Sequence, residues 1–502
     1  MLRKGAIISA LASALRSAPA ERPALDDGVH RLTYGEAHAA VTAERGWLAS
    51  SGAERFAILA DNGVPWAITD LALHLLGNVS VPLPGYFTEA QMTHALDDAG
   101  IDGLVTDCPE RLLASLPGWR MADTSPGTGL ALLRRSLQAG ARPEVPQGTV
   151  KITYTSGSTA APKGVCLSAG QLETVATSLA DATSALQIQR HLCLLPLATL
   201  LENVAGLYAP LLAGATCLLP STASTGLSYA GTDAPKLLAT VSAAQPESLI
   251  LVPELLQLFV IAAERGWKVP DTLKFIAVGG ASVSPSLLER ASAVGLPVYE
   301  GYGLSECASV VCLNTPQSRR PGSVGKPLPH ARLRLTEAGE IVVSGPKMLG
   351  YLGGESRTTT DEWATGDLGE VDADGYVYVR GRARNVFITS YGRNVAPEWV
   401  EREITQRLPQ RPVLVHGEAQ PFAIALISGV PGDAEKALVA RVIAEANAAL
   451  PDYARIRRWA CVPESFSFAN GLLTSNGRLR RAAIVERHRP LIDSLYRESL
   501  SA

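Results

Sequence analysis

The sequence contains little charge, no regularly spaced cysteines and no long apolar segment. Charged residues make up 19% of its 502 positions and the formal net charge is -3, so we expect no basic surface for nucleic acid. Its seven cysteines form no CxxC pair, which favours a reduced protein of the cytoplasm over a disulfide framework. No apolar segment approaches the roughly 20 residues of a membrane-spanning helix, so no transmembrane segment is expected.

The first twenty residues, MLRKGAIISALASALRSAPA, have two interpretations. Arg3 and Lys4 before a short apolar segment, with Ala-Pro-Ala at residues 18–20, resemble a weak signal peptide. The Ala, Leu and Ile residues of the same segment also suit an amphipathic first helix, which is the interpretation we favour.

Apolar segments typical of strands alternate with longer segments rich in Ala and Leu, as in RFAILADNG before WAITDLALHLLG. This alternation predicts an α/β fold with stacked, parallel sheets. From about residue 331, short segments with the turn signals Glu-Ala-Gly-Glu and Asp-Ala-Asp-Gly predict hairpins and a small β-rich subdomain over about 331–383. We therefore expect a large N-terminal domain over residues 1–383 and a small α+β C-terminal domain over residues 384–502.

The segment TYTSGSTAAPKGV, residues 153–165, has the composition of an anion-binding loop. Small residues at 156–158 let backbone N–H groups converge, hydroxyls add further donors, and Lys163 supplies a positive charge that would suit a triphosphate. The segment is not a Walker P-loop, because Lys163 precedes Gly164 and no Ser or Thr follows. The alternative is a flexible polar loop between a strand at KITYT and a helix.

This segment resembles the Tyr-Thr-Ser-Gly-Ser-Thr-Gly-x-Pro-Lys-Gly-Val loop of the adenylate-forming (AMP-binding) superfamily. Further segments resemble that family in the same order: LPLATLLENVAGLYAPLLAGA, FIAVGGASVS, YEGYGLSE, TGD, GRARNVFITSYGRNVAPEWVE and LLTSNGRLRR. The resemblance extends from about residue 23 to residue 481 and is strongest to the acyl-CoA synthetases. It implies an AMP-forming acid-thiol ligase that uses ATP and Mg²⁺ and has a mobile C-terminal domain.

The resemblance also implies catalytic roles. Lys163 and the loop before it would hold the β and γ phosphates, and Glu306 would ligate Mg²⁺. Arg478, in the closing loop, would act at the α-phosphate. Arg384 would be the hinge between the two domains.

The resemblance implies a nucleotide site as well, in which Tyr302 stacks on adenine while Asp367 and Arg382 bind the ribose side. The full set of expected nucleotide-binding residues is Thr155, Ser156, Gly157, Ser158, Thr159, Gly280, Ala281, Glu300, Gly301, Tyr302, Gly303, Ser305, Asp367 and Arg382.

Three positions depart from the family pattern. Ala160 stands where the family usually has Gly, and we expect this to change the mobility of the loop rather than to abolish binding. Thr199 replaces the His of Leu-Pro-Leu-x-His, and a hydroxyl at the start of a helix is an equal alternative for it. Arg478 replaces a Lys; it keeps the charge but its planar group needs more room, and a solvated basic segment at 478–481 is the alternative.

The expected acid pocket offers neither a cation nor a carboxylate, which argues against an amino-acid substrate. We therefore expect an apolar carboxylic acid, fatty or aromatic, and as acceptor either CoA or the phosphopantetheine of a free acyl carrier protein. The segment LGGES at 352–356 mimics a carrier-protein site but lies inside the nucleotide-binding region, so any carrier would act in trans. The alternative function is a nucleotide-binding homologue impaired in catalysis. The residues expected to line the pocket are Thr199, Leu200, Val204, Leu207, Val278, Gly303, Cys307 and Ala308.

Overall fold

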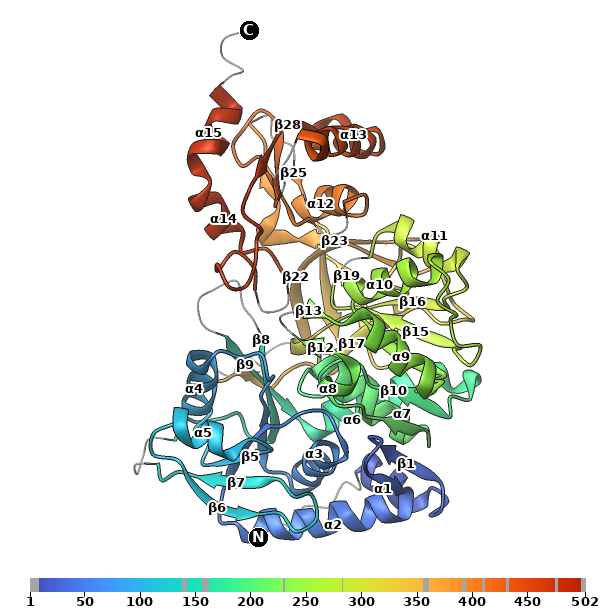
Figure 1. The fold of residues 1–502 in the computed structure, drawn as a ribbon, viewed down its shortest axis with the longest axis vertical. Helices are drawn as coiled ribbons and strands as arrows, with labels where there is room; N and C mark the ends of the chain where they lie inside the picture. The colour runs from blue at the N-terminus through green and yellow to red at the C-terminus, as the bar shows by residue number, and fades with distance from the viewer. Residues whose placement is uncertain are drawn as a thin grey trace. The chain divides into compact units, whose positions relative to one another are not determined.

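The computed structural model describes residues 9–137, 142–155, 162–228, 231–281, 283–354, 361–390, 394–408, 411–429, 433–474 and 477–497. The chain divides into two compact units. Unit 1 contains Met1–Ala281, Arg290–Leu333 and Val343–Trp363, and unit 2 contains Ser282–Glu289, Arg334–Val342 and Ala364–Ala502. Both units combine helices with sheets (Figure 1), so the predicted α/β fold class is confirmed.

A nine-stranded sheet forms one half of unit 1. Its strands are β1 (Pro23–Asp26), β2 (Arg31–Thr33), β10 (Arg190–Leu192), β11 (Thr216–Leu218), β14 (Ser248–Leu251), β15 (Phe275–Val278), β16 (Val298–Leu304), β17 (Ser309–Leu313) and β18 (Lys326–Pro327). They lie in the order β18-β17-β16-β15-β14-β10-β11-β1-β2. The strands from β16 to β11 pair in parallel. Short apolar segments such as SLIL and FIAV suit these positions because both faces of a parallel sheet are covered.

An eight-stranded sheet forms the other half. Its strands are β3 (Arg55–Leu59), β4 (Val79–Pro82), β5 (Gly103–Thr106), β6 (Arg120–Thr124), β7 (Ala131–Arg134), β8 (Thr149–Thr155), β9 (Lys163–Ser168) and β21 (Gly350–Tyr351), in the order β21-β9-β8-β4-β3-β5-β7-β6. The polar loop after β8 is followed by strand β9, not directly by a helix. The alternative that placed a helix there was therefore wrong: the apolar residues at 165–167 are all fully buried and extend the sheet.

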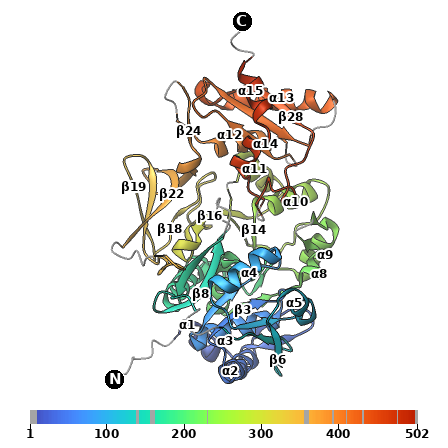
Figure 2. The ribbon, with the colours of Figure 1, turned by 90° about the vertical axis from the view of Figure 1, so that its left-hand side faces the viewer.

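Helices pack against these sheets in more than one core cluster. The helical segments up to residue 307 are α1 (Ala10–Ser17), α2 (Tyr34–Ser50), α3 (Val64–Leu76), α4 (Glu89–Asp98), α5 (Pro109–Ser115), α6 (Ala169–Thr183), η1 (Ser184–Leu186), the π-helix η2 (Glu202–Tyr208), α7 (Ala209–Leu212), α8 (Thr222–Thr225), α9 (Ala234–Ala244), α10 (Pro253–Glu264), α11 (Pro285–Ala293) and η3 (Ser305–Cys307). A short sheet of β12 (Leu227–Ser228) and β13 (Gly231–Thr232) lies before α9. Residues of α1, α2, α3, α6 and η2 join both large sheets in one cluster, while α4 and α5 cover the opposite face of the eight-stranded sheet (Figure 2).

The first helix is amphipathic, as predicted. Ser9 caps α1 by accepting a hydrogen bond from the Ala12 amide, and Leu11 and Leu15, one turn apart, are buried in the core. In the described part of the chain, none of the helices has both the length and the apolar character needed to cross a bilayer.

A four-stranded sheet follows in the region predicted to be β-rich. Its strands are β19 (Arg332–Leu335), β20 (Glu340–Ser344), β22 (Glu362–Val371) and β23 (Val377–Arg382), in that order. Both predicted turns are confirmed: Gly339 lies between β19 and β20 with φ +79°, and Gly375 lies between β22 and β23 with φ +85°. Glycine suits both positions because other residues rarely adopt positive φ.

The C-terminal part of unit 2 is a three-stranded sheet covered on both faces. Its elements are η4 (Ala383–Asn385), β24 (Phe387–Ile388), β25 (Asn394–Val395), α12 (Pro397–Thr405), β26 (Val413–His416), β27 (Ala423–Ser428), α13 (Asp433–Ala449), η5 (Asp452–Ala454), β28 (Ile456–Val462), α14 (Arg481–Arg487) and α15 (Arg489–Arg497). Because side chains alternate along a strand, Ala425 packs with α12 and α13, whereas Leu426 packs with α14 and α15. Figure 1 shows these two pairs of helices on opposite sides of the sheet.

Candidate functional site

Lys163 is held at the start of a strand beside an aromatic ring. Lys163 begins β9, where its backbone pairs with Thr155 of β8, and its side chain is exposed. Its Nζ lies 5.5 Å from the centre of the Tyr351 ring, which is within the range of a cation–π contact. The next residue must be small, since a Cβ on Gly164 would lie 2.9 Å from Ile152 Cγ2. The predicted loop residues Ser156, Gly157, Ser158, Thr159 and Ala160, and the side chain of Thr155, lie outside the described residues.

Glu306 meets the same tyrosine. The Tyr351 hydroxyl donates a hydrogen bond of 2.8 Å to Glu306 Oε1, and the Met348 amide donates to the Glu306 carbonyl oxygen at 2.6 Å. Tyr351 belongs to β21, which pairs antiparallel with β9 so that Tyr351 lies opposite Val165. The structure therefore brings two predicted catalytic residues, Lys163 and Glu306, to one side chain of unit 1.

Tyr351 is a residue that the sequence analysis missed. The only signal was a Tyr in MLGY, just before the LGGES segment. Its importance depends on the pairing of β21 with β9, which joins segments far apart in the chain.

The backbone around Glu306 is tightly constrained. Strands β16 and β17 form an antiparallel hairpin through η3, with a register shift between Tyr302 and Gly303. A Cβ on Gly303 would lie 1.9 Å from the Ser309 carbonyl oxygen, so only glycine fits. Ala308 and Ser309 have φ of +59° and +107°, which is unfavourable for residues with a side chain. Such strained positions concentrate at functional sites.

The predicted adenine-binding segments lie together at one edge of the nine-stranded sheet. Val278, the last residue of β15, pairs with Glu300 of β16, so Gly280 and Ala281 follow one strand where its parallel pairing with the neighbouring strand ends. In open parallel sheets this carboxyl edge is where ligands bind. The Glu300 carboxylate is buried and accepts a hydrogen bond of 2.9 Å from the Gly322 amide, while Tyr302 is half-buried. Ser305, in η3, is half-buried as well.

Asp367 and Arg382 form an ion pair in unit 2. They are opposite one another on β22 and β23, and Arg382 Nε lies 2.8 Å from Asp367 Oδ1. The Arg382 guanidinium also donates to the Thr365 carbonyl oxygen at 3.1 Å, and the Thr365 hydroxyl accepts from the Asp367 amide at 3.1 Å. Gly366, inside β22 between Thr365 and Asp367, has φ +72°, which glycine adopts without strain. The side chain of Arg384 lies outside the described residues.

Arg478 lies three residues before α14. Its amide donates to the Thr474 hydroxyl at 3.1 Å, the Thr474 amide donates to its carbonyl oxygen at 2.7 Å, and its side chain is exposed. Arg481 differs, because it is paired with the buried carboxylate of Glu401 through both guanidinium nitrogens. Arg481 is therefore not part of a solvated basic segment, while Arg478 keeps both of its interpretations.

The residues predicted to bind the acid are mostly core residues. Val204 and Leu207 of η2 and Ala308 belong to the large hydrophobic core, and Val278 and Cys307 are also buried. Burial raises the pKa of the Cys307 thiol to about 12, and the nearby Glu306 adds to the rise. The Thr199 hydroxyl donates to the Pro196 carbonyl oxygen at 2.7 Å, so this side chain stabilises the turn before the helix.

Polar side chains behind η2 form a buried network. Lys151 Nζ lies 2.8 Å from Asp70 Oδ1 and 3.0 Å from the Tyr208 hydroxyl, and it donates to Asn203 Oδ1 as well. Burial alone would raise the pKa of Asp70, but Lys151 and the hydroxyl and amide donors reverse this and lower it. Glu202, the first residue of η2, is also a buried carboxylate. The sequence analysis quoted the segment that contains Glu202 but assigned this residue no role.

A surface cavity of about 490 Å³ lies elsewhere in unit 1. It is lined by Trp267, Pro270, Asp271 and Val294 among others, and none of the predicted site residues lines it. Its size alone therefore does not identify it as the functional site, because the residues with suitable chemistry lie at the sheet edge and around Tyr351.

Comparisons with known proteins show which family and which relatives the chain resembles. A family model described as AMP-binding enzyme matches residues 11–352, and one described as AMP-binding enzyme C-terminal domain matches residues 384–500. The long-chain-fatty-acid–CoA ligase FadD15 of Mycobacterium bovis is 27% identical over an alignment of 540 positions, gaps included, that covers 88% of each chain. A feruloyl-CoA synthase of an Amycolatopsis species is 31% identical over 415 residues, covering 76% of this chain and 79% of the relative. The solved structure of the Bacillus subtilis O-succinylbenzoate CoA synthetase MenE with ATP and magnesium ion has a TM-score of 0.72 at 23% identity, covering 94% of this chain and 98% of that one.

Proposed function

The chain belongs to the AMP-binding enzyme family, and from this we propose that it is an ATP-dependent acid-thiol ligase. A carboxylate is a poor acylating agent, whereas its mixed anhydride with AMP carries a good leaving group. In the first half-reaction the carboxylate oxygen bonds to the α-phosphorus of ATP and pyrophosphate leaves. In the second, a thiol attacks the acyl carbon, AMP leaves and a thioester forms. The observation that carries the proposal is the meeting of Lys163 and Glu306 at Tyr351.

We propose that these residues bind the triphosphate and its magnesium ion. Lys163 and the loop at 156–159 hold the β and γ phosphates, and Glu306 ligates Mg²⁺, a hard cation that prefers carboxylate oxygens. When bound, Mg²⁺ neutralises negative charge that develops on the leaving pyrophosphate. The Tyr351 hydroxyl engages Glu306 Oε1, which fixes the orientation of the carboxylate and leaves Oε2 as the ligand atom. The chemistry of this donor set fits magnesium.

The remaining nucleotide contacts are proposed from the family. Gly280, Ala281 and the backbone of residues 300–303 surround adenine with Tyr302 stacked on it, and Ser305 contacts the α-phosphate. Asp367 accepts hydrogen bonds from the ribose hydroxyls. Arg382 orients the Asp367 carboxylate, and the 2.8 Å ion pair between the two side chains supports this assignment.

We propose that the acceptor is the thiol of CoA, since the two relatives named above are a CoA ligase and a CoA synthase. A carrier-protein phosphopantetheine supplied in trans is the second candidate. In the family cycle the C-terminal domain, residues 384–502, turns about Arg384 between the half-reactions, and Arg478 acts in the first of them. Seven free thiols suit the reducing cytoplasm, where we propose that the protein works.

We propose an apolar acid as the substrate. We take Val204, Leu207, Val278, Cys307 and Ala308 as the walls of the acid site, and their burial among apolar groups, with a Cys307 thiol that stays neutral, supports an apolar substrate. The two relatives act on a long-chain fatty acid and on an aromatic acid, so both classes belong in a test.

Acid-dependent exchange of pyrophosphate into ATP tests the function. The purified protein is assayed with Mg²⁺ against saturated fatty acids of increasing length, cinnamic and benzoic acids, and amino acids. We expect exchange with fatty or aryl acids and none with amino acids. Absence of exchange with every acid, in protein that is folded and binds ATP, would favour the catalytically impaired homologue instead.

A further inference from the structure

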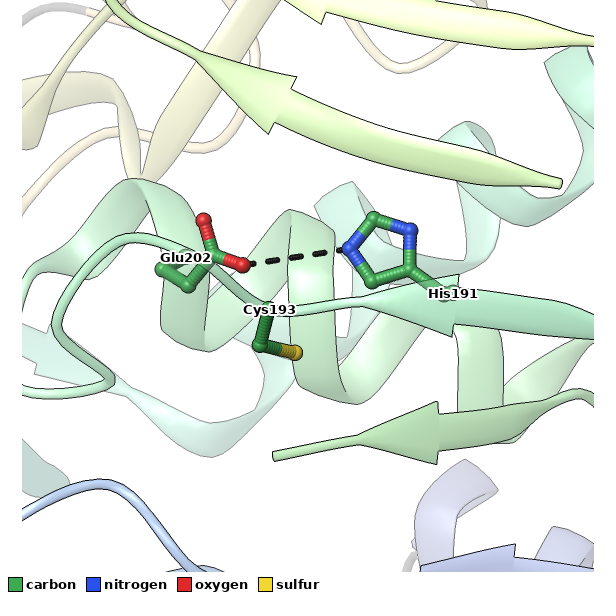
Figure 3. A group of neighbouring side chains, drawn as sticks. All are labelled: His191, Cys193 and Glu202. Atoms are coloured by element: carbon green, nitrogen blue, oxygen red, sulfur yellow. Dashed lines mark ion pairs between the residues drawn. The ribbon is translucent and has the colours of Figure 1, made fainter. Parts of the chain in front are cut away.

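Three buried side chains with metal-binding atoms lie together beside η2. His191 is in the middle of β10, Cys193 follows the end of that strand, and Glu202 is the first residue of η2. Figure 3 shows the imidazole and the carboxylate pointing toward one another, with the thiol below them. One ligand atom from each residue lies within 4.8 Å of the others, and all three side chains are at least nine-tenths buried.

Two of the three side chains have polar atoms without hydrogen-bond partners among the described residues. Neither oxygen of Glu202 nor His191 Nε2 forms a well-aligned hydrogen bond. Burial raises the pKa of Glu202, and the nearby His191 ring, Cys193 thiol and Leu195 amide offset this only in part. The nearest approach between them is 3.8 Å, from His191 Nε2 to Glu202 Oε1. Buried polar groups are almost always satisfied, so this arrangement requires a partner that the side chains themselves do not provide.

The surroundings orient the His191 ring, and the residue that faces it carries no side chain. His191 Nδ1 and Ser248 Oγ are 2.8 Å apart, which fixes the ring and directs Nε2 toward the carboxylate. A hydrogen bond on the second ring nitrogen is the usual arrangement for a metal-binding histidine. Gly206 faces the same space: a Cβ there would lie 2.5 Å from Glu202 Oε1 and 3.2 Å from His191 Nε2.

We propose that His191, Cys193 and Glu202 bind one divalent transition metal ion of the zinc class. Nitrogen, sulfur and oxygen ligands together suit a borderline cation such as Zn²⁺ rather than Mg²⁺. In a tetrahedral zinc site, bonds of about 2.0–2.3 Å place neighbouring ligand atoms roughly 3.3–3.8 Å apart, so the three side chains need to close by about 1 Å. The Gly206 carbonyl oxygen, 3.1 Å from Cys193 Sγ, is a candidate fourth ligand.

Charge balance favours the same assignment. On binding, the Cys193 thiol releases its proton to solvent, and Glu202 is ionised, so two negative ligands and a neutral imidazole match a divalent ion. The resulting cluster is neutral, which is the form that a buried site accepts. The ion would tie η2 to β10, so its role is structural and independent of the proposed reaction and of the Mg²⁺ proposed at Glu306.

Metal analysis of the full-length wild-type protein is the primary test. Protein produced with zinc in the medium and dialysed against metal-free buffer should retain about one zinc per chain. X-ray absorption at the zinc edge should show one sulfur at about 2.3 Å together with nitrogen or oxygen ligands at about 2.0–2.1 Å. A zinc content below about one tenth per chain, with no uptake when Zn²⁺ or Co²⁺ is added, would overturn the proposal, as would a bound ion without a sulfur ligand.

Variants then identify the ligands. Cys193→Ser and Glu202→Gln should each weaken zinc affinity by more than tenfold, and Ser248→Ala by about tenfold or more through loss of ring orientation. Cys312→Ser is the matched control, because it makes the same change at another buried cysteine and should leave the zinc content unchanged. Co²⁺-loaded protein should show a thiolate charge-transfer band. Cys193→Ser should lose this band and Cys312→Ser should keep it. Equal bands in both variants would contradict the assignment.

Discussion

Replacing Tyr351 by Phe tests the arrangement of the catalytic residues most sharply. The substitution removes one oxygen atom and keeps the aromatic ring that lies 5.5 Å from Lys163 Nζ. It therefore deletes the 2.8 Å hydrogen bond to Glu306 Oε1 without removing the cation–π contact. A hydrogen bond to a charged group contributes about 1.5–3 kcal/mol, and Tyr351 is half-buried, so we take the lower value. At about 1.4 kcal/mol per factor of ten, adenylation should slow roughly tenfold.

The assay is acid-dependent pyrophosphate exchange, measured as a function of Mg²⁺ concentration. If Tyr351 positions the Glu306 carboxylate for the ion, Tyr351→Phe should raise the Mg²⁺ concentration needed for half-maximal rate as well as lower the maximum. Tyr378→Phe is the matched control, because it removes a tyrosine hydroxyl that donates to a carboxylate, that of Asp372, in unit 2. A Tyr351→Phe enzyme with unchanged Mg²⁺ dependence and a rate within twofold of wild type would refute the reasoning.

Four further predictions concern other parts of the molecule. Lys163→Ala should reduce pyrophosphate exchange about tenfold or more, because it removes a charge that stabilises the leaving pyrophosphate; a loss below threefold would contradict this role. Arg478→Ala should slow exchange yet leave the transfer of preformed acyl-AMP to a thiol near the wild-type rate; two intact half-reactions would make Arg478 a surface residue. Lys151→Met should lower the free energy of unfolding in urea by about 3–5 kcal/mol, since it leaves the Asp70 carboxylate buried without its cation, and a change below 1 kcal/mol would contradict that estimate. Val204→Phe should shorten the longest acid accepted without changing ATP binding, because overpacking a filled site costs about 1–3 kcal/mol; an unchanged chain-length profile would move the pocket elsewhere.

Much of the fold could be predicted because its signals are local. The hairpin glycines Gly339 and Gly375 adopt the positive φ that their turn sequences demand. Gly303 is required by a contact with Ser309, six residues away, so the constraint on the YEGYGLSE segment is also local in the chain. The alternation of apolar segments was likewise sufficient for the parallel strands at the centre of both large sheets, because each buried strand is a short continuous segment. It did not predict the antiparallel pairs toward the edges of these sheets.

The contacts that organise the site could not be predicted in the same way, because they join distant segments. Tyr351 reaches Glu306 only through the pairing of the two-residue strand β21 with β9, and no periodicity marks so short a strand. Glu202 has the sequence environment of an ordinary helix start. Its burial follows from the packing of η2 near His191 of β10, which the sequence around Glu202 does not show. Thr199, in contrast, could be assigned to either of two roles, and the structure shows its hydroxyl bonded within the local turn.

The central claim is that this chain makes an acyl adenylate and then a thioester. Its most direct test is a single-turnover reaction of the full-length protein with ATP, Mg²⁺ and the acid that gives the fastest exchange, followed by mass spectrometry of the quenched products. We predict acyl-AMP and pyrophosphate before CoA is added, and acyl-CoA with AMP afterwards. ADP and phosphate in place of AMP and pyrophosphate, or no product of the acid at all, would contradict the claim.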